Sequence, residues 1–209
     1  FGCGTGTHAI LLNKYNYYVL GIDISSKMIS IAKKKIKNNQ NKNIEFKKAN
    51  IKYLNLKKKF NAVISMFHVL SYQTETSEIK NFFKNSYNHL HRNGILIFDF
   101  WYGPGIILSK QIRREKKIQI KNNFFKRISE PKINYSKNTV NVKISVNSLS
   151  AGKSKTLIKE NHKMRYFFIP EVEYYLSSYG FELISVNKSF TNQMPNNDDW
   201  NAIVVAKKK

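Results

Sequence analysis

Short apolar runs alternate with segments of helical periodicity along the first hundred residues. Buried or half-buried strands are predicted at Tyr17–Ile22, Ile44–Lys48, Phe60–Phe67 and Ile95–Phe100. Helices are predicted at Thr7–Lys14, from Ser25 or Ser26 to about Lys37, and at Ser77–His91. We expect Asn93-Gly94 to end the last helix, because glycine accepts the left-handed conformation that a helix C-terminus requires. Strands that alternate with helices are typical of βαβ units and a parallel sheet.

The pattern changes after Pro104. Three segments of alternating, β-branched character follow with no helix between them: Lys117–Ile128, Thr139–Leu149 and Lys155–Phe168. They predict an antiparallel β insertion at about residues 105–168. The earlier rhythm resumes with a helix and two strands at Pro170–Tyr179, Phe181–Val186 and Asn201–Ala206. Without an internal repeat or a long linker, we expect residues 1–209 to form a single domain.

Composition narrows the class of protein. The 209 residues are 42% hydrophobic, enough for a full core, and no apolar run approaches the ~20 residues needed to cross a bilayer. We therefore expect a protein without a membrane segment. The single cysteine, Cys3, excludes an internal disulfide and suits a reducing cytoplasm. It also excludes a cysteine-based zinc site. His89 and His91 point to different helix faces, so no metal site is expected.

The formal net charge of +23 allows two interpretations. Lysines could neutralise the phosphates of a nucleic acid, or they could cover a solvated surface. The lysine runs lie far apart, at Lys33–Lys35, Lys57–Lys59 and Lys207–Lys209. This scatter favours a solvated surface over a nucleic-acid partner.

Glycines dominate the stretch with which the chain opens, FGCGTGTHA. Gly2, Gly4 and Gly6 allow a tight turn that brings backbone N–H groups and a helix N-terminus close to a ligand. Read from Gly4, the residues also fit the dinucleotide pattern G-x-G-x-x-A, which ends at Ala9. The glycines alone leave a nucleotide cofactor and chance both open.

Two polar residues at strand ends strengthen the nucleotide interpretation. Asp23 follows the strand Tyr17–Ile22, where a carboxylate can accept hydrogen bonds from the hydroxyls of a ribose. Asn50 follows the next strand and is placed to contact an adenine, with Ile51 as its apolar neighbour. Helix capping by Asp23 and turn formation by Asn50 are the purely structural alternatives.

At this point the sequence resembles a known family. The stretches that carry the resemblance are FGCGTG, GID at 21–23, ANI at 49–51, FNAVISMF at 60–67 and HLHRNGILIFDF at 89–100. In this order they resemble the class I S-adenosylmethionine-dependent methyltransferases. Three further stretches are similar to bacterial sugar N,N-dimethyltransferases of the desosamine and mycaminose type: SMFHVLSYQTE at 65–75, FDFWYGPG at 98–105 and ENHKMRYFFIPEVEYYL at 160–176.

The resemblance implies an α/β, Rossmann-like, mostly parallel seven-stranded sheet whose first strand leads into the glycine loop. That strand is missing from this sequence, which is in this sense N-terminally truncated. It would lie between the strands that end at Ile22 and Phe67. We therefore expect this chain to bind its cofactor poorly or to fold marginally. Asn50 also departs from the Asp that many relatives carry.

A hydride-transfer alternative rests on Tyr53 and Lys57. These two residues have the spacing of the tyrosine–lysine pair of short-chain reductases. They follow the third strand, however, and not the helix where such a pair would act, so we treat the match as coincidence.

The cofactor implied by the resemblance is S-adenosylmethionine. Its binding residues would be Gly2, Cys3, Gly4, Gly6, Asp23, Ile24, Asn50, Ile51, Met66 and Phe67. The ligand crevice of an open α/β sheet lies beyond the carboxyl ends of its strands. This rule places His68 beside the cofactor and Trp101 and Tyr102 on the substrate side. His162 and Arg165 could reach the substrate from the insertion.

His68, Tyr102 and His162 are the catalytic candidates, with side-chain packing as the alternative role for each. The sequence suggests no acid–base pair, which favours a mechanism of positioning over proton abstraction.

The function that we expect is methyl transfer to a small molecule, with an amino sugar or an anionic sugar nucleotide as the leading candidate. The basic composition suits such a substrate. RNA or protein methylation and a non-catalytic cofactor-binding fragment are the alternatives. The insertion could serve as a lid or as a homodimer contact.

Overall fold

The computed structural model describes residues 1–37, 43–109, 112–120, 123–150 and 153–209. The helices are α1 (Thr7–Lys14), α2 (Ser26–Ile36), α3 (Thr76–Asn88), α4 (Gly103–Leu108) and α5 (Ile169–Ser178), with short 3-10 turns η1 (Ile51–Tyr53), η2 (Leu70–Tyr72) and η3 (Tyr135–Lys137). The strands are β1 (Val19–Asp23), β2 (Ile44–Lys48), β3 (Phe60–Ser65), β4 (Leu90–Tyr102), β5 (Arg114–Ile120), β6 (Asn123–Asn134), β7 (Thr139–Ser150), β8 (Lys153–Phe167), β9 (Phe181–Lys188) and β10 (Asn201–Lys208). Among these helices, none has the length and apolar character needed to cross a membrane.

Strand β4 is the centre of the larger sheet. It pairs in parallel with β3, from Phe60↔Leu90 to Ser65↔Phe98, and antiparallel with β10, which in turn pairs with β9. Strands β1 and β2 form a separate parallel pair. The expected class, a Rossmann-like α/β fold with an antiparallel β insertion, is confirmed.

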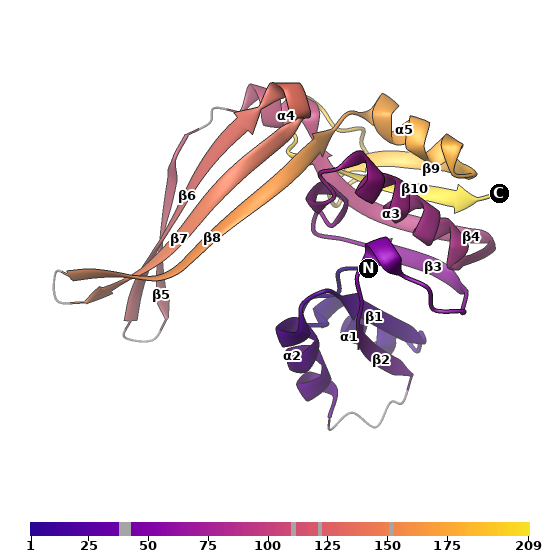
Figure 1. Ribbon diagram of the computed structural model, residues 1–209, viewed down its shortest axis with the longest axis horizontal. Coiled ribbons are helices and arrows are strands. Elements are labelled where there is room, and N and C mark those ends of the chain that lie inside the picture. The colour runs from indigo at the N-terminus through magenta and orange to yellow at the C-terminus, as the bar shows by residue number, and fades with distance from the viewer. Residues whose placement is uncertain (38–42, 110–111, 121–122, 151–152) are drawn as a thin grey trace.

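Strands β1 and β3 do not pair with each other. Residues 1–3 lie between the two groups of strands and form hydrogen bonds to both. The Phe1 nitrogen donates a hydrogen bond of 2.7 Å to the Ile64 carbonyl of β3. On the other side, the Cys3 N–H donates to the Ile22 carbonyl of β1 at 2.8 Å. The chain start therefore bridges the two groups, as the position of the N-terminus in Figure 1 shows.

The insertion is an antiparallel sheet of four strands, β5 to β8, which projects from the rest of the molecule (Figure 1). It joins the larger sheet where β8 pairs with the end of β4, at Trp101↔Tyr166 and Tyr102↔Phe167. Because β10 occupies the opposite edge of β4, β8 continues along the edge that β3 has left. The prediction of a single strand at Lys117–Ile128 is wrong: this range contains parts of β5 and β6, which pair antiparallel up to Ile120↔Asn123, and residues 121–122 lie outside the described residues.

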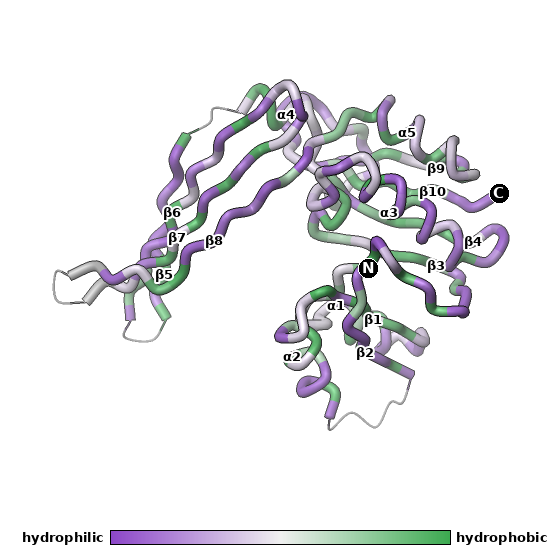
Figure 2. Tube along the Cα trace, in the orientation of Figure 1, coloured by the Kyte–Doolittle hydropathy of each residue, from purple (hydrophilic) through white to green (hydrophobic). Residues whose placement is uncertain are grey.

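The main core lies between the larger sheet and the helices α3 and α5. Phe82 and Phe83 of α3 pack edge-to-face against Phe98 of β4, and all three are fully buried. Figure 2 shows apolar residues along β3 and β4, and alternating polar and apolar residues along the insertion strands. A smaller core forms between α1, α2 and the pair β1–β2, around Phe46 and Ala32.

The predicted C-terminus of α3 is also wrong. The helix ends at Asn88, and Leu90 already pairs with Phe60 as the first residue of β4. Leu90 is fully buried, and this burial draws the chain into the sheet before it reaches Gly94. The left-handed residue is Asn93, with φ of 63°, within the strand.

Candidate functional site

The glycine loop connects residues 1–3 to helix α1 and is held by Asp23 at the end of β1. One carboxylate oxygen of Asp23 accepts a hydrogen bond from the Gly4 N–H at 2.8 Å, and the other accepts one from the Ser25 N–H at 2.8 Å. Gly4 has open space beside it, since no heavy atom lies within 4 Å of the place where a Cβ would stand. The loop therefore presents bare backbone to a ligand.

Gly6, in contrast to Gly4, has no space for a side chain. Its φ is 79°, and a Cβ there would lie 2.5 Å from Cζ of Phe46. Any side chain would push α1 away from β2. The Cys3 side chain packs against the smaller core, and burial raises the pKa of its thiol to about 11. Cys3 can therefore contribute its backbone to a ligand site, but not a thiolate.

The other predicted cofactor residues lie at neighbouring strand ends. Ile24, after β1, is 64% exposed, and Phe67, after β3, is 63% exposed, so both present apolar surface to solvent. Asn50 caps η1, with its side-chain oxygen accepting from the Lys52 N–H at 2.9 Å. Ile51 and Met66 are half-buried, and Ile51 packs against the main core.

The chain leaves β3 through a left-handed turn. Phe67 and His68 have φ values of 67° and 64°, a conformation that costs about 1–3 kcal/mol for each such residue. Asp99 of β4 compensates for this strain: its carboxylate accepts hydrogen bonds from the Phe67 N–H at 3.1 Å and the His68 N–H at 2.7 Å. The turn directs the chain away from β4, which frees the edge to which β8 pairs.

The same carboxylate lies beside the imidazole ring. Nδ1 of His68 is 3.3 Å from Oδ2 of Asp99, but it does not meet the geometry of a hydrogen bond, so the contact acts through charge. Burial lowers the pKa of His68, and the Asp99 charge opposes this effect. Burial raises the pKa of Asp99, and the hydrogen bonds from the Phe67 and His68 N–H groups oppose this effect. The His68 ring meets Trp101 edge-on, with 6.2 Å between ring centres.

A cavity of about 620 Å³ lies between this turn and the insertion. From the larger sheet and its loops it is lined by Phe67, His68, Tyr72, Trp101 and Trp200. From α4 and the insertion it is lined by Ile106, Ser109, Arg114, Glu115, Lys116, Arg127, Ser129, Pro131, Val140, Val142, Ile144, His162 and Met164. Its walls are thus aromatic and aliphatic, with basic side chains from β5 and β6.

A second polar group joins the insertion to the loop after β3. The Tyr72 hydroxyl lies 3.0 Å from Nδ1 of His162, and Nε2 of His162 lies 3.1 Å from the Glu160 carboxylate. Tyr72 comes from η2 and the other two residues come from β8. This chain of contacts fixes the imidazole of His162 at the cavity wall.

The structure brings His68, Trp101 and His162 together at the cavity but places Tyr102 and Arg165 elsewhere. Tyr102 packs against the main core, and Arg165 donates a hydrogen bond of 2.7 Å to Glu171 of α5. Strand geometry is the reason, because neighbouring residues of a strand point to opposite faces. Tyr102, next to Trp101, therefore points to the face away from the cavity. Arg165, three positions after His162, likewise lies on the opposite face of its strand.

Several residues of the site were missed by sequence reasoning. Asp99, Tyr72, Glu160 and Trp200 come from distant parts of the chain, and no spacing links them. Asp99 alone carried a signal, as an acidic residue in the apolar run ILIFDF. Within the described residues no cluster of His, Cys, Asp or Glu could hold a metal ion.

Comparisons with known proteins agree with this geometry. Residues 1–94 match the family model described as a methyltransferase domain. A Geobacillus protein (strain WCH70) named as a methyltransferase is 37% identical over 98 residues, which are 47% of this chain and 39% of that protein. The dTDP-3-amino-3,4,6-trideoxy-alpha-D-glucopyranose N,N-dimethyltransferase of Streptomyces venezuelae is 26% identical over 118 residues, 54% of this chain and 48% of that protein. The chain thus spans less than half the length of these curated relatives.

Solved structures match over nearly the whole chain. An S-adenosylmethionine-dependent methyltransferase from Clostridium acetobutylicum has a TM-score of 0.84 at 20% identity, over 99% of this chain and 81% of that one. An amino pentose methyltransferase from Micromonospora echinaspora, solved with S-adenosylmethionine bound, has a TM-score of 0.79 at 16% identity, over 100% and 81%. At these identities the likeness concerns the fold.

We predict that the Arg165–Glu171 pair serves stability. Both side chains are largely buried, at 17% and 22% exposure, so Glu171→Gln leaves an unpaired cation and should lower the free energy of unfolding by about 1–3 kcal/mol. Glu130→Gln, at an exposed pair with Arg113, is the control and should change it by less than about 1 kcal/mol. Urea unfolding measures both. Equal, small effects would mean that Arg165 is not held by Glu171 and is available for another role.

Proposed function

Because residues 1–94 match a methyltransferase domain and the described chain has the fold of S-adenosylmethionine-dependent methyltransferases, we propose that this protein transfers a methyl group from S-adenosylmethionine to a small amine-bearing molecule. The main support for the proposal is that the glycine-loop side of the site and the cavity both adjoin the Phe67–His68 turn. Phe67, which follows β3, lies beside helix α1, into which the glycine loop leads, and the cavity begins at Phe67 and His68. His8 of α1 contacts the Phe67 ring, with 5.0 Å between ring centres, which joins the loop side to the turn.

The residues at the strand ends fit the proposed cofactor. Gly4 leaves open backbone for the amino acid part, and Asp23 has the acceptor capacity for ribose hydroxyls beyond its two backbone donors. The Asn50 oxygen is used by Lys52, so its NH₂ group is left to donate to an adenine nitrogen. Exposed Ile24 and Phe67 supply apolar contacts for the rings.

The chemistry that S-adenosylmethionine supplies is an electrophilic methyl group on a sulfonium. The contribution of the protein is alignment, since an in-line displacement requires the acceptor atom at a fixed place and angle. Trp101 and Trp200 form an aromatic corner, with 6.4 Å between ring centres, against which an acceptor ring can rest. We assign His68 to the polar contacts of the acceptor. His162 also lines the cavity, but its ring nitrogens contact Tyr72 and Glu160, so we assign it to the wall against which the acceptor rests.

The cavity favours an acceptor the size of a sugar nucleotide. Its volume falls within the range of small-molecule sites, roughly 300–1,000 Å³. Three cations, Arg114, Lys116 and Arg127, outnumber the one carboxylate, Glu115, on its insertion wall, and this balance suits an anionic group such as a diphosphate. The Streptomyces venezuelae relative acts, by its name, on a dTDP-linked amino sugar, which supports the amino sugar proposed here.

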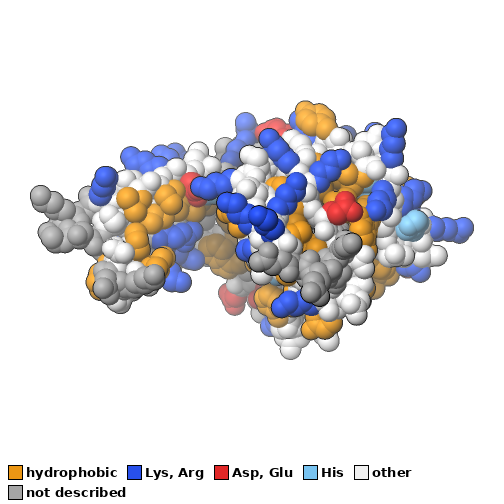
Figure 3. Space-filling view, turned by 90° about the horizontal axis from the view of Figure 1, so that it is seen from below, with side chains coloured by type: hydrophobic (Ala, Val, Ile, Leu, Met, Phe, Trp, Pro, Cys, Tyr) orange, Lys and Arg blue, Asp and Glu red, His pale blue; other side chains and the backbone are white. Residues whose placement is uncertain are grey.

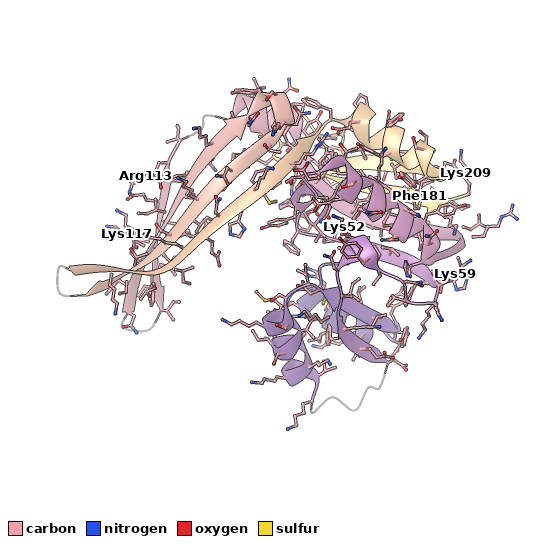
Figure 4. All side chains as sticks on the ribbon, viewed as in Figure 1. Lys52, Lys59, Arg113, Lys117, Phe181 and Lys209 are labelled. Atoms are coloured by element: carbon pink, nitrogen blue, oxygen red, sulfur yellow. The ribbon has the colours of Figure 1, made fainter. Side chains whose placement is uncertain are left out.

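The alternative of RNA methylation predicts basic residues gathered around the mouth of the site. Figure 3 instead shows Lys and Arg side chains over the insertion and over the rest of the face that it presents. The labelled Lys52, Lys59, Arg113, Lys117 and Lys209 of Figure 4 likewise lie at separate places on the molecule. This spread supports a solvated basic surface, with a small acceptor in the cavity.

We predict that Asp23→Ala weakens S-adenosylmethionine binding about 10- to 100-fold, because hydrogen bonds to a charged group contribute roughly 1.5–3 kcal/mol. Isothermal titration calorimetry on the purified protein measures the Kd. Glu182→Ala, which removes an exposed carboxylate from β9, is the control and should leave the Kd unchanged. Far-UV circular dichroism verifies that each variant folds. Equal affinity in Asp23→Ala and the native protein would remove Asp23 from the cofactor site.

We also predict that Lys116 and Lys117, neighbours on β5, behave differently. Lys116 lines the cavity and Lys117 does not. Lys116→Gln should raise the KM for a dTDP-linked amino sugar roughly tenfold, because it loses one charge-assisted contact, with kcat little changed. Lys117→Gln should leave both constants unchanged. Transfer of radiolabel from S-adenosylmethionine measures the reaction.

Three results would contradict the acceptor proposed here. One is an equal effect of the two lysine substitutions. Another is equal methylation of the amino sugar with and without its nucleotide, which would exclude recognition of the diphosphate. The third is transfer of label into RNA or protein in place of the sugar, which would favour the alternative function.

A further inference from the structure

A buried carboxylate lies directly behind the turn that separates the cofactor side of the site from the cavity. Asp99 is 4% exposed. Its oxygens accept from the backbone N–H groups of Phe67 and His68, and one of them also lies 3.3 Å from Nδ1 of His68. One side chain thus fixes the backbone of the turn and the side of the imidazole ring that faces β4.

The two nitrogens of His68 consequently have different surroundings. Nδ1 is buried against the carboxylate, whereas the side chain as a whole is 27% exposed and lines the cavity. The negative charge of the ionised carboxylate, 3.3 Å from Nδ1, favours the tautomer that carries the proton on Nδ1. Nε2 then keeps a free lone pair.

We propose that Asp99 is a positioning residue for His68, and that Nε2 of His68 takes the proton which an ammonium group in the cavity must lose before it can accept a methyl group. The inference rests on the proposed function and deepens it. It restricts the acceptor class to amines that arrive protonated.

The proton transfer balances within the site. The N–H bond of the ammonium breaks, a new N–H bond forms at Nε2, and the lone pair remains on the amine nitrogen, ready for methylation. The resulting imidazolium faces the Asp99 carboxylate, and its proton passes to water because the ring is partly exposed. An aliphatic hydroxyl is too weak an acid for this base, whereas an ammonium group with a pKa near ~8 is acidic enough to transfer its proton to it.

The charge state of the ring agrees with this role. Burial lowers the pKa of His68 below its ordinary value of 6.5, so the ring is neutral at pH 7 and can accept a proton. The Asp99 charge works in the opposite direction and keeps the ring basic. The other titratable or charged groups that line the cavity are Tyr72 from η2, His162 from β8, and Arg114, Glu115, Lys116 and Arg127 from β5 and β6.

The direct test is ¹⁵N NMR of the histidine rings in the native protein and in Asp99→Asn. In the native protein we expect His68 to carry its proton on Nδ1 and to titrate below pH 6.5. In Asp99→Asn the negative charge that favours a proton on Nδ1 is gone, so the tautomer should change toward Nε2–H. The midpoint should fall further, because the charge that raised the pKa is gone. An unchanged tautomer and midpoint would overturn the proposal.

Two further variants separate positioning from general damage. Glu160→Gln is the matched control, because it removes the carboxylate beside the other imidazole; it should alter the signals of His162 and leave those of His68 unchanged. His68→Gln keeps the backbone bonds to Asp99 and serves if Asp99→Asn does not fold. It should lower kcat for an amino sugar nucleotide about 100-fold or more, while the Kd for S-adenosylmethionine stays within threefold. Full activity in His68→Gln would overturn the proposal.

The two proposals fail in different ways. A native protein that binds no S-adenosylmethionine and methylates no amine contradicts the proposed function, and the proton transfer inferred here falls with it, whatever the tautomer. A native protein that methylates amines while His68 keeps its tautomer in Asp99→Asn contradicts only the present inference.

Discussion

The site depends on how one edge of β4 is shared. Strand β10 pairs along the other edge of β4, so β3 and β8 must use the same edge in succession. This is possible only because the chain turns away after Ser65, through two residues in the left-handed conformation that Asp99 stabilises. Without that turn, the insertion could not join the sheet at Trp101 and Tyr102.

The same turn gives the proposed enzyme its arrangement of compartments. On one side lie the glycine loop, Asp23 and Asn50, which are held by short hydrogen bonds at the ends of β1 and β2. On the other side, the insertion closes a cavity against Trp101, with Tyr72 contacting His162 across the boundary. Binding on both sides of one rigid turn is what an in-line transfer between two ligands requires.

Local patterns predicted the first part of the molecule well, and the resemblance to class I methyltransferases is confirmed. Helix Thr7–Lys14 and strand Ile44–Lys48 have the predicted bounds, because periodicity is a local property. Asp99, Tyr72 and Glu160 could not be found this way, since their partners are set by strand pairing between distant segments. Strand alternation, applied to the sequence, could have excluded Tyr102 beside Trp101. That the chain binds cofactor poorly stays a prediction.

We propose that the cofactor and the acceptor meet at the Phe67–His68 turn. A crystal structure of the protein with S-adenosylhomocysteine tests it most directly. We expect the ribose at Asp23, the amino acid part along the glycine loop, and the sulfur directed past Phe67 toward the cavity beside His68 and Trp101. A nucleoside bound away from Asp23, or a sulfur that points away from the cavity, would contradict it.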